Sequence, residues 1–163
     1  MPKITKKILN KVFWRTQASQ FAHNYERMQS LSLTYCFNPV LEELYKDAPK
    51  EERVHALQRH LEYFNTHPLA IPFILGISAA LEETTTEDQK DSVVAIKTSL
   101  MGPFAGLGDS MLNLTWYPIA GSIGASMCVG NGSLIGPLVM FIMINALYWP
   151  IKYFGIHWGY SKG

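Results

Sequence analysis

The fold is decided by residues 110–151, SMLNLTWYPIAGSIGASMCVGNGSLIGPLVMFIMINALYWPI, a run of 42 residues without a charge. Soluble domains carry charges on roughly a quarter of their residues, spread along the chain. Here Asp109, Lys152 and Lys162 are the only charged residues beyond Lys97. A charge-free run of this length predicts that the C-terminal part of the chain is embedded in a membrane.

The membrane-embedded part, residues 98–163, is predicted to contain two helices. A polar turn at 130–133 (GNGS) leaves 110–129 and 133–151, each close to the roughly 20 residues that cross a bilayer. The second stretch is the stronger candidate, because the first is interrupted by asparagine, proline and two glycines. Basic residues flank both ends of the tract. They would hold both ends on the cytoplasmic side, which predicts a hairpin.

The first 97 residues carry 24 of the 27 charged residues. They are predicted to form the mostly cytoplasmic or interfacial helical part of the same single domain, 1–163. At its start, Ile4, Ile8 and Val12 form one apolar stripe on a basic helix. This amphipathic pattern is typical of a helix lying on an anionic membrane surface, and equally of a solvated helix end. No signal-peptide pattern is present, so we expect the bacterial inner membrane with a cytoplasmic N-terminus.

Two helices are expected next along the chain. Residues 19–36 are predicted to be helical, with Asn38 and Pro39 ending the helix, because the residue before a proline disfavours helical backbone. Residues 51–64 predict an amphipathic helix that packs on an apolar partner. Its apolar positions follow helical spacing and are Val54, Leu57, Leu61 and Phe64.

The next expected helix is short and apolar. Residues 69–81 form a run of 13 residues, too short to span a membrane, which predicts a buried core helix or a re-entrant segment. Residues 82–91 predict a surface loop. Thr86 and Gln89 have the spacing of a capping box for a helix that runs to about Met101.

The segment LMGPFAGLGDS, residues 100–110, is predicted to interrupt a helix within the membrane. Broken helices at membrane depth line cavities and point to transporter binding sites. Asp109 is the sole charge between positions 98 and 151, and a lone intramembrane carboxylate suggests a functional site. A carboxylate can accept two hydrogen bonds from sugar hydroxyls. Alternatively, Asp109 caps a helix that begins at Ser110, a role that is compatible with ligand binding.

Four stretches together carry a resemblance to a known family. They are residues 24–29 (NYERMQ), 59–68 (RHLEYFNTHP), 100–110 and 132–137 (GSLIGP), and the closing residues 159–163 (GYSKG) are also similar. In this order and spacing, the chain resembles the IID membrane subunit of the mannose, fructose and sorbose family of the bacterial phosphotransferase system.

The resemblance implies an all-α membrane subunit that pairs with a IIC subunit to form a hexose pathway. Phosphate reaches the sugar through the IIA and IIB phosphocarriers, and the IID subunit is not itself phosphorylated. No enzymatic activity or cofactor is therefore expected. The five histidines show no metal-ligand spacing, so no metal is expected either. The implied substrate-binding residues are Asn24, Glu26, Asn65 and His67, in addition to Asp109. Members of the family extend well beyond position 163, so the chain is expected to be incomplete at its C-terminus.

Two other classes of function stay open. A truncated, membrane-anchored module could bind partners without transporting sugar. A membrane-embedded enzyme could use Asp109 as a general acid or base, but the membrane tract offers no second positioned group for that chemistry. Sugar translocation in a complex is the leading interpretation.

Overall fold

The structure is a computed structural model that describes residues 3–129 and 134–163, so the predicted turn at 130–133 lies outside the described residues. The described part is helical and contains no strand, which confirms the all-α prediction. The helices are α1 (Lys6–Arg15), α2 (Ser30–Leu44), α3 (Lys50–His60), α4 (Ile71–Thr84), α5 (Asp91–Gly108), α6 (Tyr117–Cys128) and α7 (Ile135–Lys162). Thr16–Ala18 and Glu87–Gln89 form 3₁₀ turns, and Asp109–Trp116 forms a π-helical segment.

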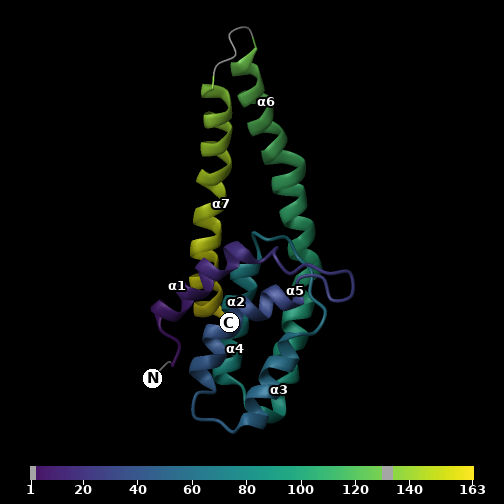
Figure 1. The fold of residues 1–163 in the computed structure, drawn as a ribbon, viewed down its shortest axis with the longest axis vertical. Helices are drawn as coiled ribbons and strands as arrows, with labels where there is room; N and C mark the ends of the chain where they lie inside the picture. The colour runs from purple at the N-terminus through teal and green to yellow at the C-terminus, as the bar shows by residue number, and fades with distance from the viewer. Residues whose placement is uncertain (1–2, 130–133) are drawn as a thin grey trace.

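Two long helical rods organise the molecule (Figure 1). The first runs without interruption through α5, the π-helical segment and α6. The second is α7, and the upper parts of the two rods form a hairpin that extends away from a bundle of α1 to α4 (Figure 1). The lower part of α7 packs against α4 and α1 within this bundle.

The hairpin has the properties of a membrane-embedded element. Within the described residues, α7 is the one helix that is long and apolar enough to cross a membrane, and 11% of its most apolar stretch is buried. A core helix of a soluble domain would be mostly buried. Large apolar side chains are exposed along both rods, among them Leu114, Ile119, Ile123, Leu138, Phe141 and Ile142. The prediction of an all-α membrane fold is thus supported, although α7 continues to Lys162 instead of ending at position 151.

Glycines bring α4 and α7 into close contact. A Cβ atom added to Gly76 would lie 2.3 Å from the carbonyl oxygen of Ile156, and one added to Gly159 would lie 2.3 Å from the carbonyl oxygen of Phe73. No side chain fits at either position, because the obstacle is backbone. The two helices therefore approach more closely than side chains at these positions would allow.

The expected helix over residues 19–36 is confirmed only from Ser30 onward, and its predicted end is wrong, because α2 begins at Ser30 and passes through Pro39. A proline lacks an N–H group, so the carbonyl of Tyr35 has no intrahelical partner. The guanidinium of Arg15 supplies one, with Nη1 donating to this carbonyl at 3.0 Å and the Arg15 charge lying 4.8 Å from the Tyr35 ring centroid. A contact from α1 therefore lets α2 continue past the proline.

The apolar stripe of α1 packs on protein, contrary to both interpretations of the sequence. Of the predicted stripe, Ile4 and Val12 are buried and Ile8 packs against the core. Phe13 is buried beside them and makes edge-to-face contacts with Trp149 and Tyr153 of α7. Aromatic contacts of this kind add to the free energy of burial. The stripe is therefore occupied, and it is not available to insert into a membrane surface.

Helix α3 confirms the expected helix, but it ends at His60 and its buried residues differ from the predicted stripe. Ala56 and His60 are buried, whereas Val54 is exposed. The expected surface loop at 82–91 is shorter than predicted, because Glu82 belongs to α4, which ends at Thr84. Glu82 and Lys90 are also buried, contrary to the prediction.

The expected capping box does not form. Helix α5 begins at Asp91, and no side chain caps its first turn. The N–H of Gln89 donates instead to the carbonyl of Thr86, at 3.0 Å. Residues 86–89 thus form a backbone turn, and the helix starts later than predicted.

Glu82 is the centre of a buried charge cluster that joins four helical segments. Its carboxylate accepts hydrogen bonds from His60 Nε2 at 2.9 Å and from Lys90 Nζ at 2.8 Å. It also accepts one from the Tyr45 hydroxyl at 3.1 Å, and Arg59 Nε lies 3.4 Å away. Burial acts to raise the pKa of Glu82, but the contacts with His60 and Lys90 lower it to about 2. Burial lowers the pKa of His60 to about 4.

We expect acid to destabilise this bundle in two stages. Because the folded pKa of His60 lies below 6.5, the unfolded chain binds more protons as pH falls from 6.5 towards 4, which lowers the free energy of unfolding by on the order of 3 kcal/mol. The contribution of the Glu82 carboxylate is present above pH 4.5 and is lost as pH falls towards 2. Thermal unfolding in detergent from pH 7 to 4 measures the first stage.

The control for this prediction is an exposed histidine on the same helix. His55→Gln should keep the wild-type pH dependence, because His55 is exposed, whereas His60→Gln should flatten it between pH 6.5 and 4. An unfolding temperature that stays constant over this range in the unaltered protein would contradict the account.

Candidate functional site

The predicted break in residues 100–110 is not present. Helix α5 continues through Pro103 to Gly108 and passes directly into the π-helical segment. Asp109 has helical backbone angles, φ −64° and ψ −45°. It therefore does not cap a helix beginning at Ser110, and that alternative is wrong. The irregular backbone begins at Asp109, near the end of the predicted stretch, and consists of wider helical turns instead of a break.

The π-helical segment aligns four residues spaced four positions apart. In an α-helix, residues four apart overshoot one full turn by about 40°, so Ala105 and Tyr117 would diverge by about 120°. The wider π turn shifts the alignment in the opposite direction. As a result Ala105, Asp109, Asn113 and Tyr117 all line the same pocket. Short π-helical segments within α-helices occur frequently at functional sites.

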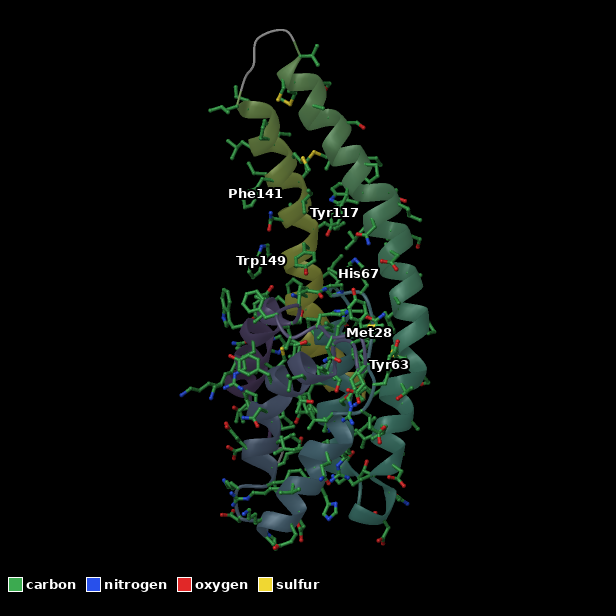
Figure 2. The ribbon with its side chains drawn as sticks, turned by 45° about the vertical axis from the view of Figure 1, so that its right-hand side comes forward. Met28, Tyr63, His67, Tyr117, Phe141 and Trp149 are labelled. Atoms are coloured by element: carbon green, nitrogen blue, oxygen red, sulfur yellow. The ribbon has the colours of Figure 1, made fainter. Side chains whose placement is uncertain are left out.

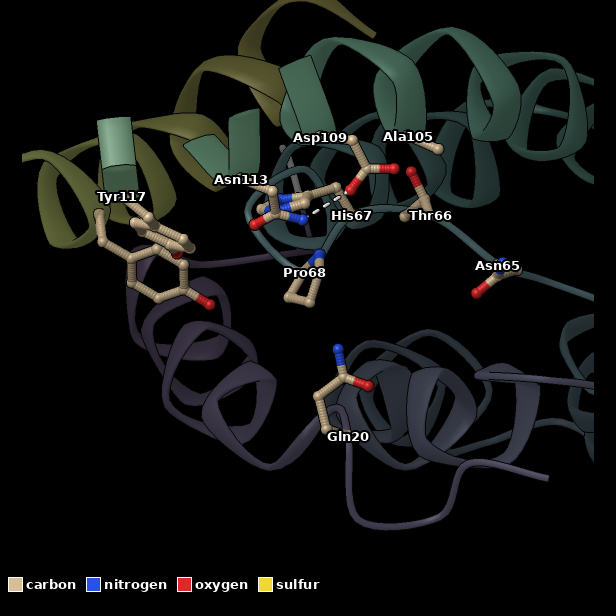
Figure 3. Close-up of a pocket in the computed structure, with 10 residues that line it drawn as sticks. Gln20, Asn65, Thr66, His67, Pro68, Ala105, Asp109, Asn113 and Tyr117 are labelled. Carbon is tan, nitrogen blue, oxygen red and sulfur yellow. Dashed lines mark hydrogen bonds between the residues drawn. The ribbon is translucent and has the colours of Figure 1, made fainter. Parts of the chain in front are cut away.

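This pocket has a volume of about 380 Å³ and is mostly polar. It lies where the hairpin leaves the bundle, near His67 and Tyr117 (Figure 2). Its size is within the range of small-molecule sites. The lining residues are Gln20, Asn65, Thr66, His67, Pro68, Ala105, Asp109, Asn113, Tyr117 and Tyr148. Figure 3 shows Asp109, Asn113 and His67 on one side and Gln20 across the open space from them.

Three predicted residues, Asn65, His67 and Asp109, thus come together in one pocket. Asp109 accepts a hydrogen bond from Asn113 Nδ2 through its Oδ1 atom, at 2.9 Å. The second carboxylate oxygen has no hydrogen bond within the described part of the chain. A ligand hydroxyl could donate to this oxygen, because an ionised carboxylate accepts through both oxygens.

His67 is held between its own loop and α5. Its Nδ1 accepts a hydrogen bond from the N–H of Leu69 at 3.2 Å, so the ring proton is on Nε2. Burial lowers the pKa of His67, against the opposing effects of Asn113 and Asp109, and the ring is neutral at pH 7. A Cβ atom on Gly108 would lie 2.3 Å from His67 Cγ. The ring therefore occupies space that only glycine at position 108 leaves open.

The loop that carries Asn65 and His67 is clamped by Gln29. The Gln29 side chain donates to the carbonyl of Thr66 at 2.8 Å and accepts from its N–H at 3.0 Å. The hydroxyl of Thr66 in turn donates to the carbonyl of Met101 in α5, at 3.0 Å. These bonds position the loop against the rod that carries Asp109.

The structure does not bring Asn24 and Glu26 to this pocket. Asn24 Oδ1 accepts hydrogen bonds from the N–H groups of Glu26 and Arg27, at 3.1 and 2.8 Å. The Asn24 backbone pairs with Met28, which has a positive φ of 53°. The side chain of Glu26 is 84% exposed. These contacts form a tight loop that precedes Gln29. Within the stretch 24–29, Gln29 is the residue that supports the pocket, through its hydrogen bonds to the backbone of Thr66.

Sequence reasoning missed several residues that line the pocket. Asn113 and Tyr117 follow Asp109 at intervals of four, but α-helical spacing would spread these positions over about 80°. Their alignment depends on the π-helical segment, which the sequence pattern does not reveal. Gln20 and Tyr148 carry no signal either, since tertiary packing brings them together from opposite ends of the chain. Thr66 was quoted within a motif but not singled out.

The fold and the pocket define a helical membrane protein with a polar pocket at the base of an apolar hairpin (Figure 1). Residues 3–163 match the model of the PTS system mannose/fructose/sorbose family IID component, and the chain belongs to this family. The family resemblance seen in the sequence is thereby confirmed.

Individual relatives agree with this assignment. The chain is 39% identical to the PTS system mannose-specific EIID component of Escherichia coli (strain K12), an alignment that covers 99% of this chain and 57% of the relative. It is 38% identical to the fructose permease IID component of Bacillus subtilis (strain 168), covering 99% and 58%. The chain thus spans less than three fifths of the length of these relatives.

A solved structure supports the same fold. The chain is similar to one chain of the cryo-EM structure of the mannose transporter ManYZ in complex with microcin E492, with a TM-score of 0.92 and 38% identity. The match covers 100% of this chain and 60% of the other. A second match, to a structure described as a membrane protein, has a TM-score of 0.89.

Proposed function

We propose that the chain contributes the IID part of a phosphoenolpyruvate-dependent sugar phosphotransferase complex. With a IIC membrane subunit it forms the pathway for uptake of a mannose-type hexose, while IIA and IIB phosphocarriers supply the phosphate. The hairpin within residues 98–163 lies in the inner membrane. Residues 1–97, with the N-terminus and the lower part of α7 packed against them, lie on the cytoplasmic side. The observation that carries the proposal is the meeting of Asn65, His67 and Asp109 in one polar pocket.

The chemistry of the pocket suits a hexose. Asp109 Oδ1 accepts from Asn113, so its second oxygen can accept a hydrogen bond from a ligand, and His67 Nδ1 accepts from Leu69, so its Nε2 can donate one. Amide side chains of Asn65 and Gln20 can do both. The rings of Tyr117 and Tyr148 add apolar surface that can cover the C–H face of a sugar ring. This combination of donors, acceptors and aromatic rings suits a sugar ring with its hydroxyl groups.

The subunit itself is proposed to carry out no phosphoryl transfer. The pocket presents one carboxylate and one neutral histidine, and the pKa of that histidine is lowered instead of raised. A phosphorylated histidine of the IIA or IIB carrier would supply the reacting phosphate. The role of the pocket is then to bind and orient the sugar.

The direct test is co-expression with a IIC subunit of the family, purification of the complex in detergent and measurement of radiolabelled mannose binding. We expect the chain to fractionate with membranes, to co-purify with IIC and to bind hexose as a complex. A complex that assembles normally and neither binds nor transports hexose would contradict the proposal. It would favour the membrane-anchored interaction module.

A glycine substitution tests the placement of His67. Gly108→Ala should weaken hexose binding by about tenfold, because the new methyl group displaces the imidazole by an ångström or more. The matched control is Gly106→Ala, where a Cβ atom meets nothing within 4 Å. Equilibrium binding to both purified complexes measures the difference. Equal affinities in the two variants would show that the His67 ring position does not matter for the sugar.

A further inference from the structure

Lys152 is a buried cation in the middle of α7. Its exposed fraction is 1%, and within the described residues no carboxylate lies within 4.0 Å of its Nζ atom. An ammonium group buried without an acidic partner is unfavourable unless other groups replace its hydration. The groups around Lys152 must therefore stabilise its charge, and their places in the fold indicate the role of the residue.

Lys152 is held by the end of α1 and by an aromatic ring. Its Nζ donates to the carbonyl of Thr16 at 3.2 Å and to Gln17 Oε1 at 3.0 Å. Thr16 is the C-terminal cap of α1, and carbonyls at a helix C-terminus carry partial negative charge. Nζ also lies 5.0 Å from the ring centroid of Tyr148, within reach of a cation–π interaction.

These contacts join two walls of the hexose pocket. Gln20 follows Gln17 by three residues, and Tyr148 precedes Lys152 by one helical turn. Gln20 and Tyr148 both line the pocket, whereas Lys152 itself does not. Figure 3 shows Gln20 across the open space from Asp109, so a shift of the segment that carries Gln20 would change the width of the pocket.

We propose that Lys152 is a positioning residue, which sets the width of the hexose pocket by holding the Gln20 segment against the Tyr148 turn of α7. This inference rests on the proposed function of the pocket. Lys152 acts through its neighbours and does not contact the sugar.

The segment that carries Gln20 has a second anchor. The hydroxyl of Ser32 donates to the carbonyl of Ser19 at 2.6 Å, which ties the segment to α2 independently of α7. Loss of Lys152 should therefore release Gln20 from α7 without unfolding the loop. A purely structural role would instead predict that the loop unfolds when Lys152 is lost.

The test uses the complete IIC–IID complex and radiolabelled mannose as the probe. Lys152→Met should weaken mannose binding by about tenfold, and Lys152→Arg should recover most of the affinity because it keeps the charge and donors. Lys162→Met is the matched control on the same helix; Lys162 is exposed, so this variant should bind as the unaltered complex does. Amide hydrogen exchange of residues 16–21 should accelerate in Lys152→Met and not in Lys162→Met.

A double-mutant cycle with Gln20→Ala identifies the mechanism. If Lys152 positions Gln20, the loss of affinity on Gln20→Ala should be smaller in the Lys152→Met background than in the unaltered protein. Fully additive losses, or unchanged binding in Lys152→Met, would overturn the inference. If Lys152→Met cannot be recovered at normal abundance, Gln17→Leu takes its place. It removes one acceptor and keeps the cation, and unchanged affinity there would also overturn the inference.

The two proposals fail in different ways. If Asp109→Asn and Gln20→Ala both leave mannose binding unchanged, the pocket is not the sugar site and the proposed function of the pocket fails. If both weaken binding while Lys152→Met does not, only the positioning role fails.

Discussion

Asp109→Asn is expected to weaken hexose binding by the IIC–IID complex roughly ten- to a hundredfold. The substitution keeps the side-chain shape, and the amide oxygen can still accept the hydrogen bond from Asn113 that Oδ1 accepts now. The second oxygen becomes an NH₂ group and can no longer accept a hydroxyl. Loss of a charged hydrogen bond costs about 1.5 to 3 kcal/mol, which corresponds to this range of affinity.

The control for this substitution is Asp91→Asn. Asp91 is exposed in the first turn of α5, on the same rod as Asp109 but remote from the pocket. Its variant should bind and transport as the unaltered subunit does. Both variants must reach the membrane in equal amounts, measured by immunoblot. Normal binding by Asp109→Asn at normal abundance would show that the carboxylate is not part of the sugar site.

Glu82→Gln is expected to lower the free energy of unfolding of the bundle by about 3 to 5 kcal/mol. The carboxylate faces Lys90 and Arg59 and accepts a hydrogen bond from His60, all within the bundle. Removing one partner of a buried ion pair leaves the other charge without compensation, which is strongly destabilising. Thermal and urea unfolding of the detergent-solubilised subunit measure the change.

Glu51→Gln provides the comparison for Glu82. Glu51 is exposed in the first turn of α3, where loss of its charge affects stability by no more than about 1 kcal/mol through the helix dipole. If the Glu82 and Glu51 variants had the same unfolding temperature and the same urea midpoint, the stabilising role assigned to the buried cluster would be contradicted. A Glu82 variant that does not accumulate in the membrane would agree with it, provided that Glu51→Gln accumulates normally.

The membrane part of the fold could be predicted from the sequence because its signal is local. A charge-free tract of 42 residues indicates a membrane environment whatever the rest of the chain does. The short apolar run at 69–81 was likewise recognisable. Of the two predicted alternatives, a buried core helix or a re-entrant segment, the burial of α4 agrees with the core helix. Both inferences depend on composition averaged over many residues, so one polar or helix-breaking residue within the stretch does not change the prediction.

The errors arise where distant residues decide the local structure. Pro39 looked like a helix end because Arg15, the residue that satisfies the carbonyl of Tyr35, lies in another helix. Glu82 looked like part of a surface loop because its partner His60 is 22 positions away. A charged side chain is expected at the surface unless a partner side chain pairs with it in the interior. The spacing of residues in the sequence did not show that His60 is such a partner for Glu82.

Only part of the pocket could be predicted, because residues distant in the sequence complete it. Asp109 could be singled out by its isolation, and Asn65 and His67 by their motif. The π-helical turn that aligns Asn113 and Tyr117 with Asp109 has no counterpart in the α-helical spacing used to read sequences.

The central claim is that a hexose binds in the pocket between the 64–68 loop and the π-helical segment. A structure of the IIC–IID complex with bound mannose tests this claim most directly. We predict sugar density within hydrogen-bonding distance of the free Asp109 oxygen and of His67 Nε2, with Gln20 on the opposite side. Sugar density elsewhere, with this pocket empty or filled by side chains of the IIC subunit, would contradict the account.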